Sequence, residues 1–339
     1  MNIGKTGQII KNIAIDSAAK VEPKVVSKIA EDVVCFGKEA AEKTLTKLSK
    51  NVDFRPSGKE FRYVSLPKGL DIVDGAILGN TEVPTIAIID LFSDFGNYKI
   101  GKKISIPHGK IVSRIMTEGL EDKIGVLALD STPKSKTEWV AMKEALDELV
   151  KLKKSGKDIK ALNLSVGASV TFDEITEKAG TIVTADVIKN QFDKILNSLR
   201  NSKDQKDTNI FEMIKSINEL VDEGVQVYLS SGNNGSSGFD LLALSRAQHI
   251  VGAEDYANAT KAFVNETAKG VYKFKILFDR DGSLKSAISD EIKFDSSDVS
   301  KVSKLGSFMS KFFGETEATI CGTSFSCPAK LNSDMKKKL

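Results

Sequence analysis

Short apolar runs recur along this chain, and within each run the apolar residues follow one another instead of alternating with polar ones. Strands that are buried on both faces have this texture, and they occur in parallel sheets that helices cover on both sides. The pattern therefore predicts an α/β fold with a mainly parallel sheet. The runs cover residues 85–90, 124–130, 161–167, 225–233 and 249–253.

Amphipathic segments separate these runs. Residues 137–154 place Met142, Leu146 and Leu149 along one stripe, which predicts a helix that ends near Gly156. Because strands and helices alternate along the chain, the helices are predicted to flank the sheet in three layers. Active groups in such folds gather at the carboxyl ends of the strands.

Two further patterns predict local structure. Asn209 and Glu212 resemble a capping box ahead of an apolar stripe, so a helix is predicted to start there and to end near Gly224. Residues 271–288 begin with alternating apolar side chains and then contain a turn signal, which is typical of a β-hairpin.

Composition excludes several classes of protein. The 339 residues are 41% hydrophobic, so the chain can bury a large core, and its net charge of +3 comes from scattered residues that form no nucleic-acid-binding surface. The three cysteines lack metal-ligand spacing and are expected to be free thiols. We find no membrane span or signal peptide, which predicts a cytoplasmic protein, with non-classical secretion as the alternative.

The N-terminal part differs in texture from the rest. Residues 23–50 have near-helical apolar spacing, and a polar, turn-rich stretch follows them. We therefore predict an N-terminal helical segment over residues 1–78 and an α/β domain over residues 79–339. Within that domain, residues 168–209 are interpreted as an insertion that contains a helix over residues 185–199.

Four polar residues lie where predicted strands or turns end, and each has an ordinary structural interpretation. Asp90 and Asn233 close apolar runs, where a carboxylate or an amide commonly caps a turn. His108 is one of two histidines and opens a predicted helix, while Ser324 follows a glycine and a threonine that together are typical of a helix cap. Taken singly, none of the four indicates catalysis.

In chain order, however, six short blocks resemble the signature blocks of the subtilisin-like serine peptidases (subtilases). The resemblance runs from about residue 84 to the C-terminus, and the last block is the most specific. The blocks are Thr85-Ile-Ala-Ile-Ile-Asp90, His108-Gly109, Leu162-Asn-Leu-Ser-Val-Gly167, Ser231-Gly-Asn-Asn-Gly235, Ile250-Val-Gly-Ala253 and Gly322-Thr-Ser-x-Ser-x-Pro328.

The resemblance implies a three-layer subtilisin-like fold and a serine endopeptidase that acts on polypeptides. It implies Asp90, His108 and Ser324 as the catalytic triad and Asn233 as an oxyanion-hole donor. It also implies that four residues bind the substrate, with Val166 indicating an apolar pocket. These are Ser165, Val166, Gly167 and Gly232.

The same resemblance bears on cofactors and on the N-terminal segment. No cofactor is required for the implied chemistry; many relatives carry structural calcium, but the sequence does not locate such a site here. Residues 1–78 are either a propeptide or a permanent packing extension. Nothing in the sequence indicates the oligomeric state.

Departures from the family pattern keep other interpretations open. Leu91 and Phe92 follow Asp90 where the family has a small residue and glycine, and the interval to His108 is short. Lys110 stands where the family usually has threonine. The alternative is a weak or inactive subtilisin-like scaffold that binds proteins. A nucleotide-binding α/β enzyme is less well supported, because no glycine-rich phosphate loop follows any predicted strand.

Overall fold

The structure is a computed structural model of the 339-residue chain. It describes residues 52–54, 72–73, 76–78, 84–92, 97–100, 104–120, 123–131, 137–279, 283–294, 301–302 and 315–339.

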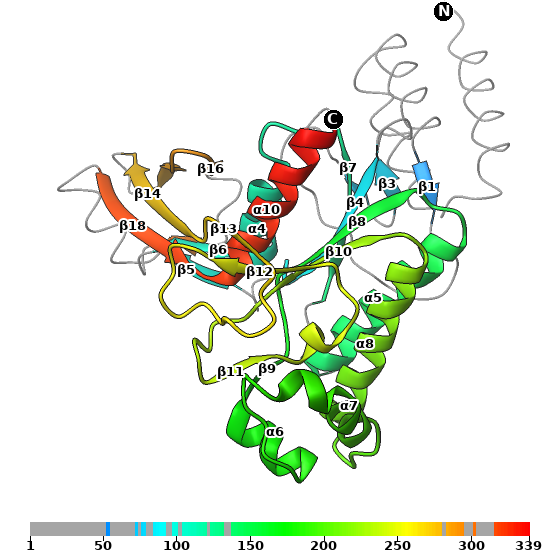
Figure 1. Cartoon of the computed structure of the whole chain (residues 1–339). Coiled ribbons are helices and arrows are strands. Elements are labelled where there is room, and N and C mark those ends of the chain that lie inside the picture. The colour runs from blue at the N-terminus through cyan, green and yellow to red at the C-terminus, as the bar shows by residue number, and fades with distance from the viewer. Residues whose placement is uncertain are drawn as a thin grey trace, which may run out of the picture.

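A six-stranded parallel sheet forms the centre of the molecule (Figure 1). Its order is β13-β12-β10-β8-β4-β7, and every neighbouring pair in it is parallel. This arrangement confirms the predicted α/β class. The strands are β4 (Thr85–Asp90), β7 (Gly125–Asp130), β8 (Ile159–Leu164), β10 (Gln226–Ser230), β12 (His249–Ala253) and β13 (Glu266–Ala268).

Helices cover both faces of this sheet, as Figure 1 shows. Successive side chains of β4 point to opposite faces: Ile86 and Ile88 join one buried cluster, while Ala87 and Ile89 join the other. Helices α4 (His108–Thr117) and α10 (Thr323–Lys338) contribute to the first cluster. Helices α5 (Glu138–Lys154) and α8 (Gln205–Asp222) contribute to the second. The three predicted layers are therefore present.

The predicted start of one helix is wrong. Helix α8 begins at Gln205, four residues before Asn209, because the Asp204 side chain caps it by accepting a 2.9 Å hydrogen bond from the Lys206 N–H. Asn209 lies inside the helix and is buried. By contrast, helix α5 starts one residue after Thr137, as its apolar stripe predicted.

Residues 168–209, which were predicted to be an insertion, contain more structure than the sequence indicated. Strand β9 (Ser169–Thr171) leads into α6 (Phe172–Ala179), followed by a 3-10 turn η2 (Ile188–Gln191) and α7 (Phe192–Arg200). The predicted helix over residues 185–199 therefore starts too early. The α6 helix, which was not predicted, has a capping box formed by Thr171 and Glu174.

An antiparallel sheet leads the chain to Ser324. Strand β14 (Val271–Phe278) pairs with β15 (Leu284–Ile288), which confirms the predicted hairpin, and β15 pairs with β16 (Lys293–Phe294). On its other edge β14 pairs with β18 (Glu315–Cys321), a strand that the sequence did not indicate. Since α10 begins directly after Gly322, β18 fixes where this helix starts.

A second antiparallel sheet fills the short interval between Asp90 and His108. Strand β5 (Asn97–Ile100) forms a hairpin with β6 (Ile104–Pro107), and β17 (Lys301–Val302) pairs with β6. Strand β6 continues without a break into α4, whose first residue is His108.

The N-terminal segment was predicted to be helical, but part of it forms strands. Strands β1 (Val52–Phe54), β2 (Ile72–Val73) and β3 (Ala76–Leu78) form a small antiparallel sheet in the order β1-β3-β2. Their valine and isoleucine residues favour strands over helices. The helix predicted over residues 23–50 lies outside the described residues, and the domain boundary stays a prediction. No helix among the described residues is long and apolar enough to cross a membrane.

Candidate active site

Asp90 and His108 form a close pair at the carboxyl end of the central sheet. The Nδ1 atom of His108 lies 2.7 Å from Oδ1 of Asp90. Because a carboxylate can only accept hydrogen bonds, Nδ1 carries the proton and Nε2 is left as the basic nitrogen. The pair thus has the tautomer that a general base requires.

Backbone groups hold Asp90 in place. It is the last residue of β4 and is completely buried, and its Oδ1 atom also accepts a 2.7 Å hydrogen bond from the Leu91 N–H. Its carbonyl oxygen accepts hydrogen bonds from the N–H and the hydroxyl of Ser131. These contacts leave the carboxylate little freedom, so it can orient the imidazole.

Asp90 also sets the basicity of His108. Burial alone would lower the pKa of His108, but the negative charge and the hydrogen bond of Asp90 outweigh it and raise that pKa above its ordinary value of 6.5. The side chain is 13% exposed, so one edge of the ring stays accessible.

Leu91 and Phe92, which follow Asp90, pack against the start of α4. A Cβ atom added to Gly109 would lie only 2.8 Å from the Phe92 ring, so this ring packs directly on the glycine that follows His108. The Gly109 N–H also donates a 2.9 Å hydrogen bond to the Leu91 carbonyl. The two residues therefore support the start of α4.

Helices α4 and α10 run side by side with their N-terminal ends together. At one end, the ring centroids of His108 and Phe325 are 5.5 Å apart. At the other, the Asn332 side chain donates 2.9 Å hydrogen bonds to the carbonyls of Met116 and Glu118. The parallel arrangement brings His108 and Ser324, which precedes Phe325, to the same end of the helix pair.

Ser324 lies in the first turn of α10, where backbone N–H groups have no partner within the helix. A Cβ atom added to Gly322 would lie 3.4 Å from Ser324 Oγ and 3.6 Å from Asn233 Nδ2, so the hydroxyl and the amide border one small space. In the part of the chain that the structure describes, no hydrogen bond joins Ser324 to His108. Catalytic hydrogen bonds are often long until a substrate binds.

Thr323 orients the amide of Asn233, a contact that sequence reasoning missed. The Asn233 Oδ1 atom accepts hydrogen bonds from the Thr323 N–H at 3.0 Å and the Thr323 hydroxyl at 3.2 Å. Since the oxygen is held in this way, the NH₂ group must point elsewhere and remains available as a donor. The Thr323 hydroxyl in turn accepts the Gly232 N–H at 3.1 Å.

The four residues expected to bind substrate occupy two segments that leave neighbouring strands. Ser165, Val166 and Gly167 follow β8, and Gly232 follows β10, which pairs with β8. Gly232 has a φ angle of 97°, a conformation that suits glycine and few other residues. Val166 packs against the buried cluster on the α5 and α8 face. The structure thus places both segments beside Asn233.

Cys327 supports one of these segments from α10. It is completely buried, and its thiol lies close to Ser165 and to the backbone at Leu164. Burial raises the pKa of this thiol well above its ordinary value, so it is unreactive at neutral pH. Cys321 is the last residue of β18, and Cys35 lies outside the described residues.

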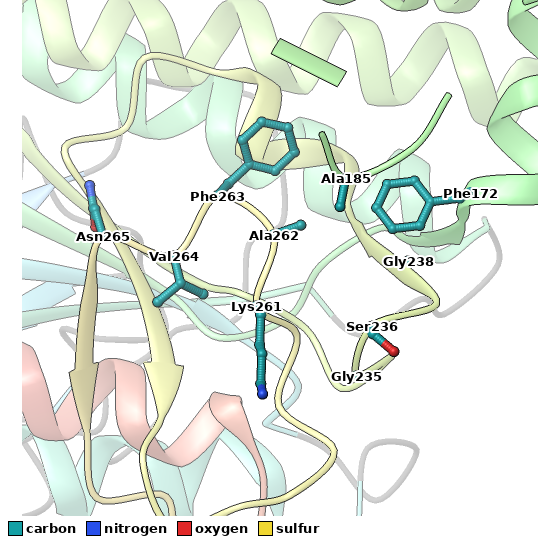
Figure 2. A pocket seen from close by; sticks show the side chains of 10 residues that line it. All are labelled: Phe172, Ala185, Gly235, Ser236, Gly238, Lys261, Ala262, Phe263, Val264 and Asn265. Atoms are coloured by element: carbon teal, nitrogen blue, oxygen red, sulfur yellow. The ribbon is translucent and has the colours of Figure 1, made fainter. Parts of the chain in front are cut away.

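Residues 168–209 contribute one wall of a cavity of about 560 Å³ (Figure 2). Phe172 and Ala185 come from these residues, while Gly235 belongs to the segment that contains Asn233. None of the residues predicted to be catalytic lines this cavity. Residues 168–209 therefore add surface next to the segment after Asn233. The remaining lining residues are Ser236, Gly238, Lys261, Ala262, Phe263, Val264 and Asn265.

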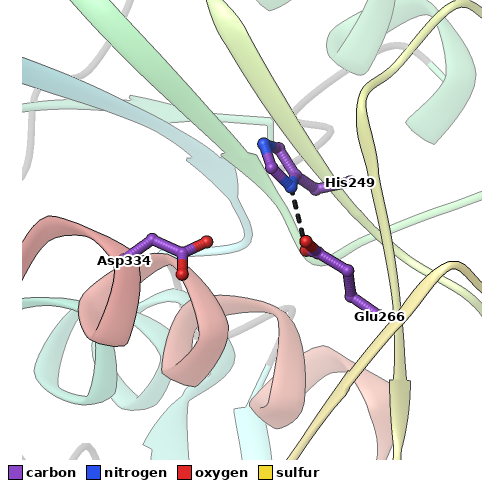
Figure 3. A group of neighbouring side chains, drawn as sticks. All are labelled: His249, Glu266 and Asp334. Carbon is purple, nitrogen blue, oxygen red and sulfur yellow. Dashed lines mark hydrogen bonds and ion pairs between the residues drawn. The ribbon is translucent and has the colours of Figure 1, made fainter. Parts of the chain in front are cut away.

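The second histidine has a different environment, shown in Figure 3. His249 begins β12, and its Nδ1 atom lies 2.8 Å from Glu266; Asp334 completes the group. Lys330 forms ion pairs with both acids, at 2.6 Å to Asp334 and 3.3 Å to Glu266. Because an ammonium already neutralises the carboxylates, the group suits a structural network better than a metal ion.

Comparison with known proteins gave structural matches alone. No family model and no curated protein matches this chain. A crystal structure of a lanthipeptide protease matches with 13% identity, over 75% of this chain and 72% of that chain, with a TM-score of 0.43. Patellamide maturation protease PatA matches with 14% identity, over 75% of this chain and 80% of that chain, with a TM-score of 0.39.

The epidermin leader peptide processing serine protease of Staphylococcus aureus matches with 13% identity, over 74% of this chain and 63% of that chain, with a TM-score of 0.39. Likenesses at this level assign neither a reaction nor site residues to the present chain.

Proposed function

We propose that this protein is a serine endopeptidase of the subtilisin-like type, with Asp90, His108 and Ser324 as its triad. The observation that carries the proposal is the 2.7 Å contact between His108 and a fully buried Asp90, at the end of the helix pair where Ser324 lies. A buried carboxylate that orients a histidine beside a serine at a helix start is an arrangement suited to activating a nucleophile.

The first half of the reaction forms an acyl-enzyme. His108 Nε2 accepts the proton of the Ser324 hydroxyl while Oγ attacks the carbonyl carbon of a peptide bond. Asp90 stabilises the imidazolium that results, and it remains ionised. The protonated His108 then donates its proton to the leaving amine, which departs as the new N-terminus.

The oxyanion formed during attack needs hydrogen-bond donors that are already in place. The Asn233 NH₂ group and the Ser324 N–H fill this role, and the start of α10 adds a partial positive charge. In the second half of the reaction, His108 removes a proton from water, which then hydrolyses the acyl-enzyme. The chemistry requires no cofactor.

The substrate is a polypeptide in an extended conformation. Ser165, Val166 and Gly167 would pair with its backbone as an added strand, which provides affinity without demanding one sequence. Gly232 borders the same region, where an added Cβ atom would lie 3.4 Å from the Ser169 hydroxyl and 3.3 Å from the Thr260 hydroxyl.

Replacing the nucleophile tests this function. Ser324→Ala should lower kcat for casein or a chromogenic peptide by about 10⁶-fold, the scale on which loss of the nucleophile disables such a triad. A fluorophosphonate probe should label wild-type protein at Ser324, and peptide mass mapping identifies the labelled residue. Ser326→Ala is the matched control, because the Ser326 hydroxyl is buried and bonds to the Thr323 carbonyl in the same turn.

Equal proteolysis by wild type and Ser324→Ala would rule out the peptidase. A folded wild-type protein without proteolysis or labelling would instead favour the binding scaffold.

A further inference from the structure

Asp240 is a buried carboxylate close to the segments that we expect to bind substrate. It is the last residue of β11 (Gly238–Asp240), pairs with Ser169 of β9, and is only 3% exposed. Its Oδ1 atom accepts a 2.9 Å hydrogen bond from the Leu242 N–H, and the Ala168 backbone lies close to the carboxylate. The bond to Leu242 holds the group in place.

Two glycines lie against this side chain. A Cβ atom added to Gly167 would be only 1.8 Å from Asp240 Oδ2, so the carboxylate occupies the space that a side chain at position 167 would need. A Cβ atom added to Gly232 would be 3.9 Å from the Cβ atom of Asp240. Asp240 thus contacts both segments that leave β8 and β10.

The position of these segments decides which part of a substrate would meet Asp240. Strands β8 and β10 are neighbours, with Leu164 opposite Leu229, so the chain beyond each strand starts from the same edge of the sheet. Asn233 belongs to the second segment. If the attacked carbonyl oxygen lies at Asn233, the residue that supplies it lies next to Gly232, and a long side chain of that residue has Asp240 within reach.

The charge of Asp240 is not neutralised within the described part of the protein. No lysine, arginine or histidine of the described ranges forms an ion pair with it. Burial raises the pKa of Asp240 to about 6, so the carboxylate is ionised at pH 8. A buried carboxylate without a cation carries a desolvation cost, and a cation brought by the substrate would offset it.

We propose that Asp240 determines specificity by binding the ammonium or guanidinium group of a lysine or arginine that supplies the attacked carbonyl. The protein then cleaves after basic residues. This inference rests on the proposed peptidase function. The apolar pocket expected from Val166 stays a separate prediction; Val166 itself packs against the buried cluster on the α5 and α8 face.

A substrate series tests the preference in the wild-type protein. Acyl-tripeptide p-nitroanilides that differ only in the last residue (Arg, Lys, Leu, Phe or Glu) are assayed at pH 8. We expect kcat/KM for the Arg and Lys substrates to exceed that for Leu and Phe on the order of 100-fold, because a desolvated charge pair contributes strongly to recognition. Faster cleavage after Leu or Phe would overturn the inference.

A charge-removing variant assigns the preference to Asp240. Asp240→Asn keeps the size of the side chain and should lower kcat/KM for the Arg substrate on the order of 100-fold, while the Leu substrate changes by less than about threefold. Asp207→Asn is the matched control, since Asp207 is also a buried acid but is paired with Lys178. An unchanged Arg preference in Asp240→Asn would also overturn the inference.

A third measurement does not depend on whether the variant folds. Benzamidine, which carries an amidinium group, should slow fluorophosphonate labelling of wild-type Ser324, whereas neutral benzamide should not. If Ser324 is labelled but benzamidine does not slow the labelling, the role of Asp240 is ruled out and the peptidase function stands. If neither labelling nor cleavage occurs, both proposals are ruled out.

Discussion

Asn332 ties the C-terminal part of α4 to α10 through 2.9 Å hydrogen bonds to the carbonyls of Met116 and Glu118. Met116 lies eight residues after His108, and Asn332 lies eight residues after Ser324. At 1.5 Å per residue, both intervals span about 12 Å of helix. One amide group therefore sets the register that brings the proposed base and the proposed nucleophile to the same level.

We predict that Asn332→Ala weakens both folding and catalysis. The variant leaves carbonyls at the end of α4 without their side-chain donor, which should cost about 1–3 kcal/mol of stability. A shift between the helices should also lower kcat, by up to about 10²-fold for a displacement near 1 Å. Urea unfolding and assays with a chromogenic peptide measure the two effects.

Ser333→Ala provides the control for this experiment, since Ser333 is exposed on the same helix turn. It should match wild type in stability and in kcat. If Asn332→Ala loses stability but keeps the full kcat, contacts other than those of Asn332 set the register between α4 and α10.

A second prediction concerns the donor of the oxyanion hole. Asn233→Ala should lower kcat by about 10²–10³-fold with little change in KM, because the donor acts mainly on the transition state. Thr323→Val should lower kcat less, by about two- to tenfold, since the hydroxyl's hydrogen bond to Asn233 Oδ1 is neutral and worth about 0.5–1.5 kcal/mol. The variant also removes the acceptor of the Gly232 N–H. Steady-state kinetics on one peptide substrate compare the two variants.

Thr323→Ser is the matched control, because serine retains a hydroxyl that can bond to Asn233 and to the Gly232 N–H. It should keep kcat close to that of wild type. If Thr323→Val and Thr323→Ser lowered kcat equally, the methyl group and not the hydroxyl would be responsible.

Much of the fold could be predicted from local patterns. The limits of β4 and β12 agree with the apolar runs at 85–90 and 249–253, because these strands are almost wholly buried. The start of α8 could not be predicted in the same way. Asp204 and Asn209 are both good caps, and Asp204 caps the helix because α7 ends at Arg200 and leaves only a few residues for the turn.

The candidate site divides along similar lines. Asp90 ends β4 and His108 directly follows β6, and only the resemblance of their sequence blocks to those of the subtilisin-like peptidases suggested that the two side chains meet. The contacts of Asn332 and Asp240 join segments that are distant in sequence: Asn332 and Met116 are 216 positions apart. The position of Asp240 depends on the pairing of β9 with β11, which no local pattern indicates.

The last prediction concerns pH. His108 must be neutral to accept a proton, and Asp90 raises its pKa above 6.5. We therefore expect kcat/KM to be highest above this pKa and to fall as the pH drops through it. The measurement is a pH profile of kcat/KM with a neutral peptide substrate, so that ionisation of the substrate does not contribute.

The Asp90→Asn variant checks that the acidic limb of this profile belongs to the Asp90–His108 pair. Loss of the carboxylate removes the influence that raises the pKa of His108, so the limb should move to lower pH. The maximal rate should fall by about 10⁴-fold, because an asparagine no longer favours the tautomer that the base requires. A limb that stays at the same pH in this variant would show that another group controls it, and His108 would lose its assignment as the base.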